Sequence, residues 1–304
     1  MPNKKISLIL SGGGARGLAH IGVLEELDAR GYTITQICGT SMGALIGGIY
    51  ACGKIEEFKG WISNLNRYRM FRLMDISFRN KGLIKGERIM KSLGEFIPDI
   101  DIAELPITFS AVASDILGRK EVVFREGSLH EALRASTSIP TLFTPVQRDG
   151  MVLVDGGVYN NLPVNHVKKK WGMRMIAVDV NSRKFEEEIA VGSEDVEKSA
   201  EEMHENEITT PDKTAKILKH DAAVTYRWML DRTISIMIEQ TALTSVSKNP
   251  PDLLINIPRK TAGMLDFLKY EMLIEEGRKS AKRYLDEFEK KESEGFFNRL
   301  LKKF

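Results

Sequence analysis

Short runs of apolar residues alternate along the chain with segments whose apolar residues recur every three to four positions. The short runs are mostly continuous and lack clean alternation, which is typical of strands in a sheet covered on both faces. They predict strands over Ile6 to Leu10, Ile34 to Cys38, Ile107 to Ala113, Glu121 to Phe124, Met151 to Val154, Met175 to Val180 and Leu253 to Ile257. The other segments predict helices over Leu18 to Arg30, Met42 to Ala51, Ile55 to Leu65, Gly86 to Phe96, Leu129 to Ala135, Asn165 to Trp171, Thr214 to Thr244 and Leu265 to Phe288. This alternation indicates an α/β fold with a mostly parallel central sheet.

The length and the charge pattern predict one domain with appendages. The chain has 304 residues, of which 42% are hydrophobic, enough for one large core. Charge is uneven, because positions 183 to 207 hold ten acidic and three basic residues while the whole chain carries +2. That stretch has too little apolar content for a core. We therefore predict a core with the motifs over 1–182, an acidic mobile insertion over 183–212, and helices and a strand completing the same domain over 213–294.

Several features favour a cytoplasmic protein. The apolar run after Lys4 and Lys5 ends at Leu10, which is too short for a signal-peptide core. Cys38 and Cys52 have no partnered framework, as suits a reducing compartment. The uncharged segment 32–53 is long enough to span a bilayer, but its threonines and glycines favour a strand followed by a small-residue helix.

A glycine-rich segment, Ser11-Gly12-Gly13-Gly14-Ala15-Arg16-Gly17, follows the first predicted strand and opens the first predicted helix. Glycines let the backbone approach a ligand closely, and amides at a helix N-terminus favour negative charge. The glycine spacing matches a dinucleotide-binding fingerprint, but that fingerprint needs an acidic residue after the second strand, where Gly39-Thr40-Ser41 stands. A nucleoside triphosphate loop fails as well, since Leu18 follows Gly17.

The second predicted strand runs into Gly39-Thr40-Ser41-Met42-Gly43, and a predicted helix follows. A strand-to-helix turn this tight needs small residues on both sides of a strained nucleophile, and it holds the serine hydroxyl out at the end of the sheet. The alternative is a turn with a capping serine, although a cap requires neither Gly39 nor Gly43. The pattern therefore predicts a serine hydrolase with Ser41 as the nucleophile.

Serine needs a base to take its proton, and two kinds of base are available. An ordinary α/β hydrolase uses a histidine downstream of the serine. His166 or a later histidine fits that order, but none stands in a recognisable loop. Asp155 is the better candidate, because a carboxylate at the end of an apolar strand and beside two glycines can reach a nucleophile on a neighbouring strand. Its alternative is an ordinary Asp-Gly turn.

Together the three segments resemble the patatin-like phospholipases. That family is known by a glycine-rich oxyanion motif with a basic residue, a Gly-x-Ser-x-Gly elbow and an Asp-Gly-Gly or Asp-Gly-Ala segment, in this order. The similarity extends to Gly17-Leu18-Ala19-His20-Ile21-Gly22-Val23-Leu24, Ala135-Ser136-Thr137-Ser138-Ile139-Pro140 and Asn160-Asn161-Leu162-Pro163-Val164, and so covers roughly residues 5 to 180. It implies a three-layer α/β/α patatin-like fold with the nucleophile elbow after the second strand.

The resemblance also implies a mechanism. Ser41 would attack an ester carbonyl with Asp155 as the direct base, without a histidine, metal or cofactor. The oxyanion hole would consist of Gly12, Gly13, Gly14 and Arg16, where Arg16 supports the loop or meets a lipid phosphate. Support for the elbow and the motifs would come from Gly17, Gly39, Gly43, Gly156 and Gly157.

Substrates implied by the resemblance are phospholipids, lysophospholipids or related acyl esters, and no nucleic acid. One alternative is a Ser-His-Asp carboxylesterase for small esters, in which a histidine is indispensable. The other is a non-catalytic lipid-binding protein of the same fold, which the intact motifs disfavour.

The last ten residues, 295–304, predict a short basic amphipathic helix. Its apolar residues are Phe296, Phe297, Leu300, Leu301 and Phe304, and its basic residues are Arg299, Lys302 and Lys303. One interpretation is peripheral contact with an anionic inner membrane surface. The other is packing on the protein's own body or on a second subunit of a homodimer. The sequence leaves both open.

Overall fold

The computed structural model describes residues 4–75, 84–169, 171–183 and 226–301. Its centre is an eight-stranded sheet with the strand order β5-β6-β3-β2-β1-β7-β8, and β4 pairs with β3 outside this path. The strands are β1 (Lys5–Leu10), β2 (Thr33–Thr40), β3 (Thr108–Asp115), β4 (Lys120–Phe124), β5 (Val146–Arg148), β6 (Met151–Asp155), β7 (Arg174–Ser182) and β8 (Leu253–Pro258). The run from β3 to β8 is parallel, while β4, β5 and β6 pair antiparallel, which confirms the mostly parallel sheet.

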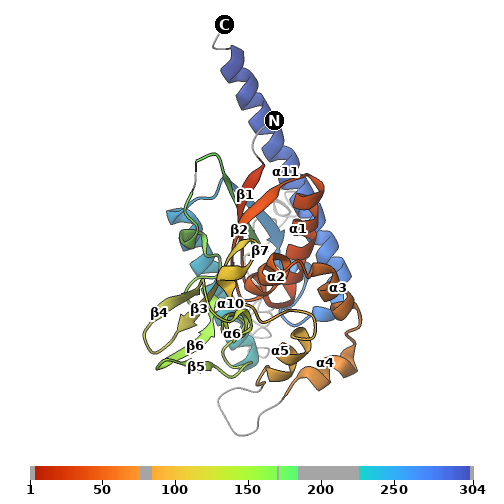
Figure 1. Cartoon of the computed structure of the whole chain (residues 1–304), viewed down its shortest axis with the longest axis vertical. Coiled ribbons are helices and arrows are strands. Elements are labelled where there is room, and N and C mark those ends of the chain that lie inside the picture. The colour runs from red at the N-terminus through yellow and green to blue at the C-terminus, as the bar shows by residue number, and fades with distance from the viewer. Residues whose placement is uncertain (1–3, 76–83, 170, 184–225, 302–304) are drawn as a thin grey trace, which may run out of the picture.

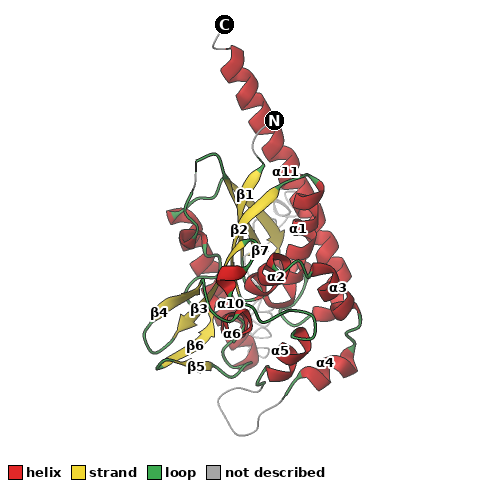
Figure 2. Cartoon of the chain, in the orientation of Figure 1, coloured by secondary structure: helices red, strands yellow, loops and turns green. Residues whose placement is uncertain are grey.

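Helices cover both faces of this sheet (Figures 1 and 2). They are α1 (Ala19–Ala29), α2 (Met42–Ala51), α3 (Ile55–Ser63), α4 (Arg67–Leu73), α5 (Glu87–Leu93), α6 (Leu129–Ser136), α10 (Tyr226–Lys248) and α11 (Tyr270–Leu301).

The core divides into two clusters that lie on opposite faces of the sheet. Leu8 and Leu10 of β1 pack in the larger cluster, which includes residues of α1, α2, α6 and α11. Ile9 packs in the smaller cluster with Ala242 of α10. Because successive strand residues point to opposite faces, the clusters mark two helical layers around one sheet. The predicted three-layer α/β/α architecture is therefore confirmed.

Some predicted elements are wrong or were missed. The segment from Asn165 to Trp171 is not a helix, and only Val164–His166 forms a single 3-10 turn. Val167 and Trp171 have helical spacing, but Val167 is buried in the smaller core cluster whereas Trp171 is fully exposed, so the segment has no buried helical face. Strand β5 and helix α4 were not predicted. Helix α11 runs to Leu301 rather than ending at Phe288.

Two predicted appendages fall largely outside the described residues. The acidic insertion over 183–212 lies there except for its first residue, as does the first part of the long helix predicted from Thr214. For the tail, α11 continues through position 301, but the side chains from 295 onward are outside the description. No helix among the described residues combines the length and apolar character needed to cross a bilayer.

Candidate active site

Strand β3 brings the ends of β2 and β6 together. Val112 pairs with Thr40 of β2, and the next residue, Ala113, pairs with Asp155 of β6. Both Val112 and Ala113 also pair with β4. A strand has only two edges, so β2 and β6 share one edge of β3 and reach it from opposite directions. The sheet therefore places Ser41, the residue after Thr40, beside Asp155.

Ser41 occupies a strained turn between β2 and α2. Its φ is 54° and its ψ is −124°, an unusual conformation for a residue with a side chain. The turn is so tight that a Cβ on Gly39 would lie 2.5 Å from the backbone of Gly43, and a Cβ on Gly43 would lie 2.4 Å from the Leu10 carbonyl oxygen. Glycine is therefore required on both sides of the serine, as the pattern predicted.

A second serine fixes the elbow. The amide of Ser41 donates to Oγ of Ser136 at 2.9 Å, and this hydroxyl donates to the carbonyl of Val112 at 2.6 Å. Ser136 is fully buried at the end of α6. It links the nucleophile to β3, and sequence reasoning noted it only as part of a similar segment. The available signal in the sequence was the similarity of the segment from Ala135 to Pro140 to the family.

The two predicted catalytic side chains are in direct contact. Oγ of Ser41 donates to Oδ2 of Asp155 at 2.5 Å, and the amide of Gly157 donates to Oδ1 at 2.8 Å. Ser41 is 5% exposed and Asp155 6% exposed. Burial raises the pKa of Asp155 to about 6, although the hydrogen bonds from Ser41 and Gly157 oppose the rise. The carboxylate is therefore more basic than usual and still ionised at neutral pH.

The glycine loop lies directly against Ser41. A Cβ on Gly12 would lie 2.9 Å from Cβ of Ser41. The amide of Gly12 donates to the Asn161 carbonyl at 3.1 Å, so it is already engaged within the protein. For the amides of Gly13 and Gly14, no acceptor is found among the described residues. Of these two residues, Gly14 lines the same cavity as Ser41.

Arg16 supports the glycine loop through hydrogen bonds. Its guanidinium donates to the Ala262 carbonyl at 3.2 Å and to Oδ1 of Asn181 at 2.8 Å. Asn181 in turn donates from Nδ2 to the Gly12 carbonyl at 2.7 Å. Of the two roles that the sequence left open for Arg16, the hydrogen bonds match loop support. Asn181 was missed, although a polar residue at the carboxyl end of β7 is the same kind of signal that singled out Asp155.

The remaining predicted glycines pack around the Ser41 elbow and Asp155. A Cβ on Gly17 would lie 2.3 Å from Cγ of Met42, and one on Gly156 would lie 2.3 Å from the Val112 carbonyl oxygen. Gly157 supplies the amide that holds Asp155. Gly17 and Gly156 have no room for a side chain, because Met42 of the elbow or the backbone of β3 lies against them.

The described histidines all have other partners. Nε2 of His20 bonds to the Ser11 carbonyl at 2.9 Å, and burial lowers the pKa of His20 to about 4. Nε2 of His130 bonds to the Ile97 carbonyl at 2.9 Å, and His166 pairs with Glu121. None of these three hydrogen-bonds to Ser41 or Asp155. His204 and His220 lie outside the described residues. Across the described part of the chain, no His, Cys, Asp and Glu side chains gather as ligands for a metal.

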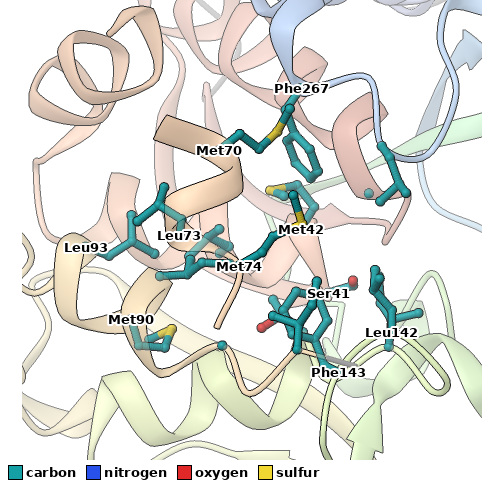
Figure 3. Close-up of a pocket in the computed structure, with 18 of the residues that line it drawn as sticks. Ser41, Met42, Met70, Leu73, Met74, Met90, Leu93, Leu142, Phe143 and Phe267 are labelled. Atoms are coloured by element: carbon teal, nitrogen blue, oxygen red, sulfur yellow. The ribbon is translucent and has the colours of Figure 1, made fainter. Parts of the chain in front are cut away.

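An apolar cavity of about 370 Å³ opens beside Ser41. Figure 3 shows side chains of α2, α4 and α5 gathered around the serine. The labelled lining residues are Met42, Met70, Leu73, Met74, Met90, Leu93, Leu142, Phe143 and Phe267. Arg134 and Thr137 are among its few polar members. The cavity lining thus suits a hydrocarbon chain, and the Ser41 side chain forms part of its wall.

Comparison with known proteins agrees with this geometry. The family model for patatin-like phospholipase matches residues 8–168, which hold the glycine loop, the elbow and Asp155. The chain belongs to the patatin-like phospholipase family. It is thereby a member of a family of lipid hydrolases.

Individual relatives extend the match beyond the motifs. An uncharacterized NTE family protein of Mycobacterium tuberculosis is 31% identical over 337 residues, covering 94% of this chain and 92% of the relative. The lysophospholipase NTE1 of Candida glabrata is 33% identical over 190 residues, covering 60% of this chain but 11% of that protein. The crystal structure of VipD from Legionella pneumophila covers 95% of this chain and 67% of that one, with a TM-score of 0.55 and 15% identity. The last likeness shows the patatin-like fold alone.

Proposed function

We propose that this patatin-like protein cleaves ester-linked fatty acid from phospholipids or lysophospholipids through a Ser41–Asp155 dyad and an acyl-enzyme. The observation that carries the proposal is the 2.5 Å contact between the Ser41 hydroxyl and the Asp155 carboxylate, at the wall of an apolar cavity. A paired nucleophile and base activate the serine, and the cavity supplies a site for an acyl chain.

Asp155 takes the proton of the Ser41 hydroxyl as the oxygen attacks the ester carbonyl. The amides of Gly13 and Gly14 stabilise the resulting oxyanion, typically the largest single contribution to such catalysis. Asp155 then gives its proton to the departing alcohol, which leaves an acyl group on Ser41. In the second half, Asp155 takes a proton from water as the water oxygen attacks the acyl carbon. Asp155 then returns that proton to Oγ of Ser41 as the bond to Ser41 breaks and the fatty acid leaves. Gly12 lets the glycine loop approach Ser41 closely. Its amide does not stabilise the oxyanion, because it donates to the Asn161 carbonyl.

The same contacts weigh against the alternatives. A Ser-His-Asp esterase needs a histidine on the serine, and each described histidine is bonded elsewhere. A binding protein without activity has no need for a strained serine in contact with a carboxylate. The apolar cavity favours long acyl chains over small esters. The name lysophospholipase attached to the Candida glabrata relative supports the same substrate class.

Active-site labelling and lipid turnover test the proposal together. We expect a fluorophosphonate probe to label the protein and fatty acid to be released from lysophosphatidylcholine or phosphatidylcholine. Ser41→Ala is expected to lose the label, while His130→Ala and His166→Ala keep both label and turnover. Label that survives Ser41→Ala, or disappears only with a histidine, would overturn the dyad.

The activity is also expected to depend on pH through Asp155. Its pKa is raised to about 6 by burial, and only the ionised carboxylate can accept the serine proton. We therefore expect kcat/KM to fall as pH drops through about 6 and to level off above it. A rate profile between pH 4.5 and 8.5 measures this, with the melting temperature followed in parallel to show that the fold persists. His166→Ala is expected to give the same profile, and a profile that changes with it would contradict the assignment to Asp155.

A further inference from the structure

Helix α4 forms part of the wall of the cavity beside Ser41, although none of its residues is fully buried. The inner side of α4 faces the cavity, which is lined by Met70, Leu73 and the following Met74, as Figure 3 shows. On its outer side, Tyr68 is 68% exposed and Phe71 is 63% exposed. The helix is therefore apolar on two sides, and only the inner one is explained by the cavity.

The outer side of α4 is also strongly basic. Arg67, Arg69 and Arg72 are all exposed, and the helix contains no acidic residue. The Arg72 guanidinium lies over the ring of Tyr68, 5.9 Å from its centroid. The nearest acid along the chain is Asp75, and its carboxylate accepts hydrogen bonds from the first amides of α5. Positive charge therefore surrounds the exposed aromatic rings.

Exposed aromatic rings between arginines match the boundary of an anionic membrane. Aromatic side chains sit favourably at the level of lipid head groups, and basic residues on the polar face attract anionic lipids. A protein partner would have to meet the same basic and aromatic surface, but a lipid surface also supplies the substrate that the cavity behind α4 takes.

We propose that α4 docks on the surface of an anionic phospholipid bilayer, with Tyr68 and Phe71 inserted at the head-group level and the three arginines on lipid phosphates. This rests on the proposed function, because it is the lipid substrate that makes a membrane the partner. A lipid that leaves the bilayer at α4 meets Met70, Leu73 and Met74 on its way to Ser41.

The exposed aromatic and basic side of α4 is distinct from the membrane contact predicted for residues 295–304. In Figure 1, α4 and α5 lie at the lower end of the molecule, whereas the end of α11 projects from the upper end. The picture is drawn with the longest axis vertical, so the two ends are far apart. A membrane contact through residues 295–304 would thus present the opposite end of the protein, and experiment can tell the two apart.

Vesicle co-sedimentation with the full-length Ser41→Ala chain tests the docking without lipid turnover. We expect binding to phosphatidylcholine vesicles that contain phosphatidylglycerol, and much weaker binding without it. Tyr68→Ala/Phe71→Ala is expected to weaken binding at least tenfold, from the loss of inserted aromatic surface. Arg67→Gln/Arg69→Gln/Arg72→Gln is expected to weaken it by roughly fivefold per charge. Added salt should reduce the binding of the parent more than that of the arginine variant.

Trp171→Ala is the matched control. Trp171 is 103% exposed, and it lies just before β7, whose first residues pair with the start of β1. Trp171 therefore lies at the amino ends of the parallel strands, whereas Ser41 follows the carboxyl end of β2. Loss of this aromatic ring is expected to leave vesicle binding unchanged.

A soluble short-chain ester separates the docking from the proposed function. The Tyr68→Ala/Phe71→Ala variant with Ser41 intact is expected to hydrolyse that ester like the parent, which also shows that it folds. If the parent fails to hydrolyse the ester, the proposed function is wrong, while the vesicle assay still reports on α4. The docking is overturned if the parent does not bind anionic vesicles, if the α4 variants bind as well as the parent, or if removal of residues 295–304 alone abolishes binding.

Discussion

Ser41→Ala and Asp155→Asn are each expected to lower kcat/KM for a lysophospholipid by a factor on the order of 10³ or more, and the double variant is expected to lose little further activity. The two side chains act as one unit, because the carboxylate takes the proton from the hydroxyl that it contacts at 2.5 Å. Either change removes that transfer. The measurement is the rate of fatty acid release by both single variants and the double variant, under conditions where the parent is far from saturation.

Thermal melts of the same variants show whether activity is lost through the site or through the fold. In Asp155→Asn, the asparagine side chain can still accept the hydrogen bond from the Gly157 amide, but it cannot act as a base. The folded state raises the pKa of Asp155 from 3.8 to about 6, so its stability contribution is greatest below pH 3.8 and is lost as pH rises through about 6. Asp155→Asn is therefore expected to melt no lower than the parent at pH 8. A double variant whose loss equals the product of the single losses would contradict the dyad.

Local patterns predicted most of the sheet because most strands contain a short, mostly apolar run that is followed by polar or glycine residues. Ser41 and Asp155 were both found in this way, at the ends of β2 and β6. Their contact was not predictable from spacing, since it depends on β3 pairing with both strands along one edge. The similarity to a known family supplied that pairing indirectly.

Residues that act through tertiary contacts gave weaker signals. Ser136 and Asn181 hold the elbow and the glycine loop, but each is a small polar residue whose partner lies far away in the sequence. Helix α4 was missed because its inner apolar residues are flanked by Arg67, Arg69 and Arg72, which conceal a one-sided pattern. In a helix that is apolar on two sides, the apolar residues do not recur with a clear helical period. Only the structure therefore shows which side of α4 faces the cavity.

Gly22→Ala is expected to destabilise the protein by about 3 kcal/mol, at the upper end of the range for overpacking. Gly22 lies in α1, where a Cβ would stand 1.9 Å from the Ile274 carbonyl oxygen and 2.6 Å from the amide nitrogen of Arg278. In the opposite direction, a Cβ on Gly277 of α11 would stand 1.9 Å from the Ala19 carbonyl oxygen. The two helices therefore cross with their backbones in contact, and a single methyl group must push them apart.

Gly60→Ala is the matched comparison for this substitution. Gly60 lies in α3 and is exposed, and a Cβ there would have no atom within 4 Å. Alanine has the higher helix propensity, so the same change is expected to stabilise the protein by about 1 kcal/mol at this position. Urea titrations of both variants give the two free energies of unfolding. Opposite signs are expected, because propensity acts at both sites and the backbone clash only at Gly22. If Gly22→Ala were neutral or stabilising, the backbones of α1 and α11 would not be in contact. The close packing of α11 against α1 would then have to be rejected.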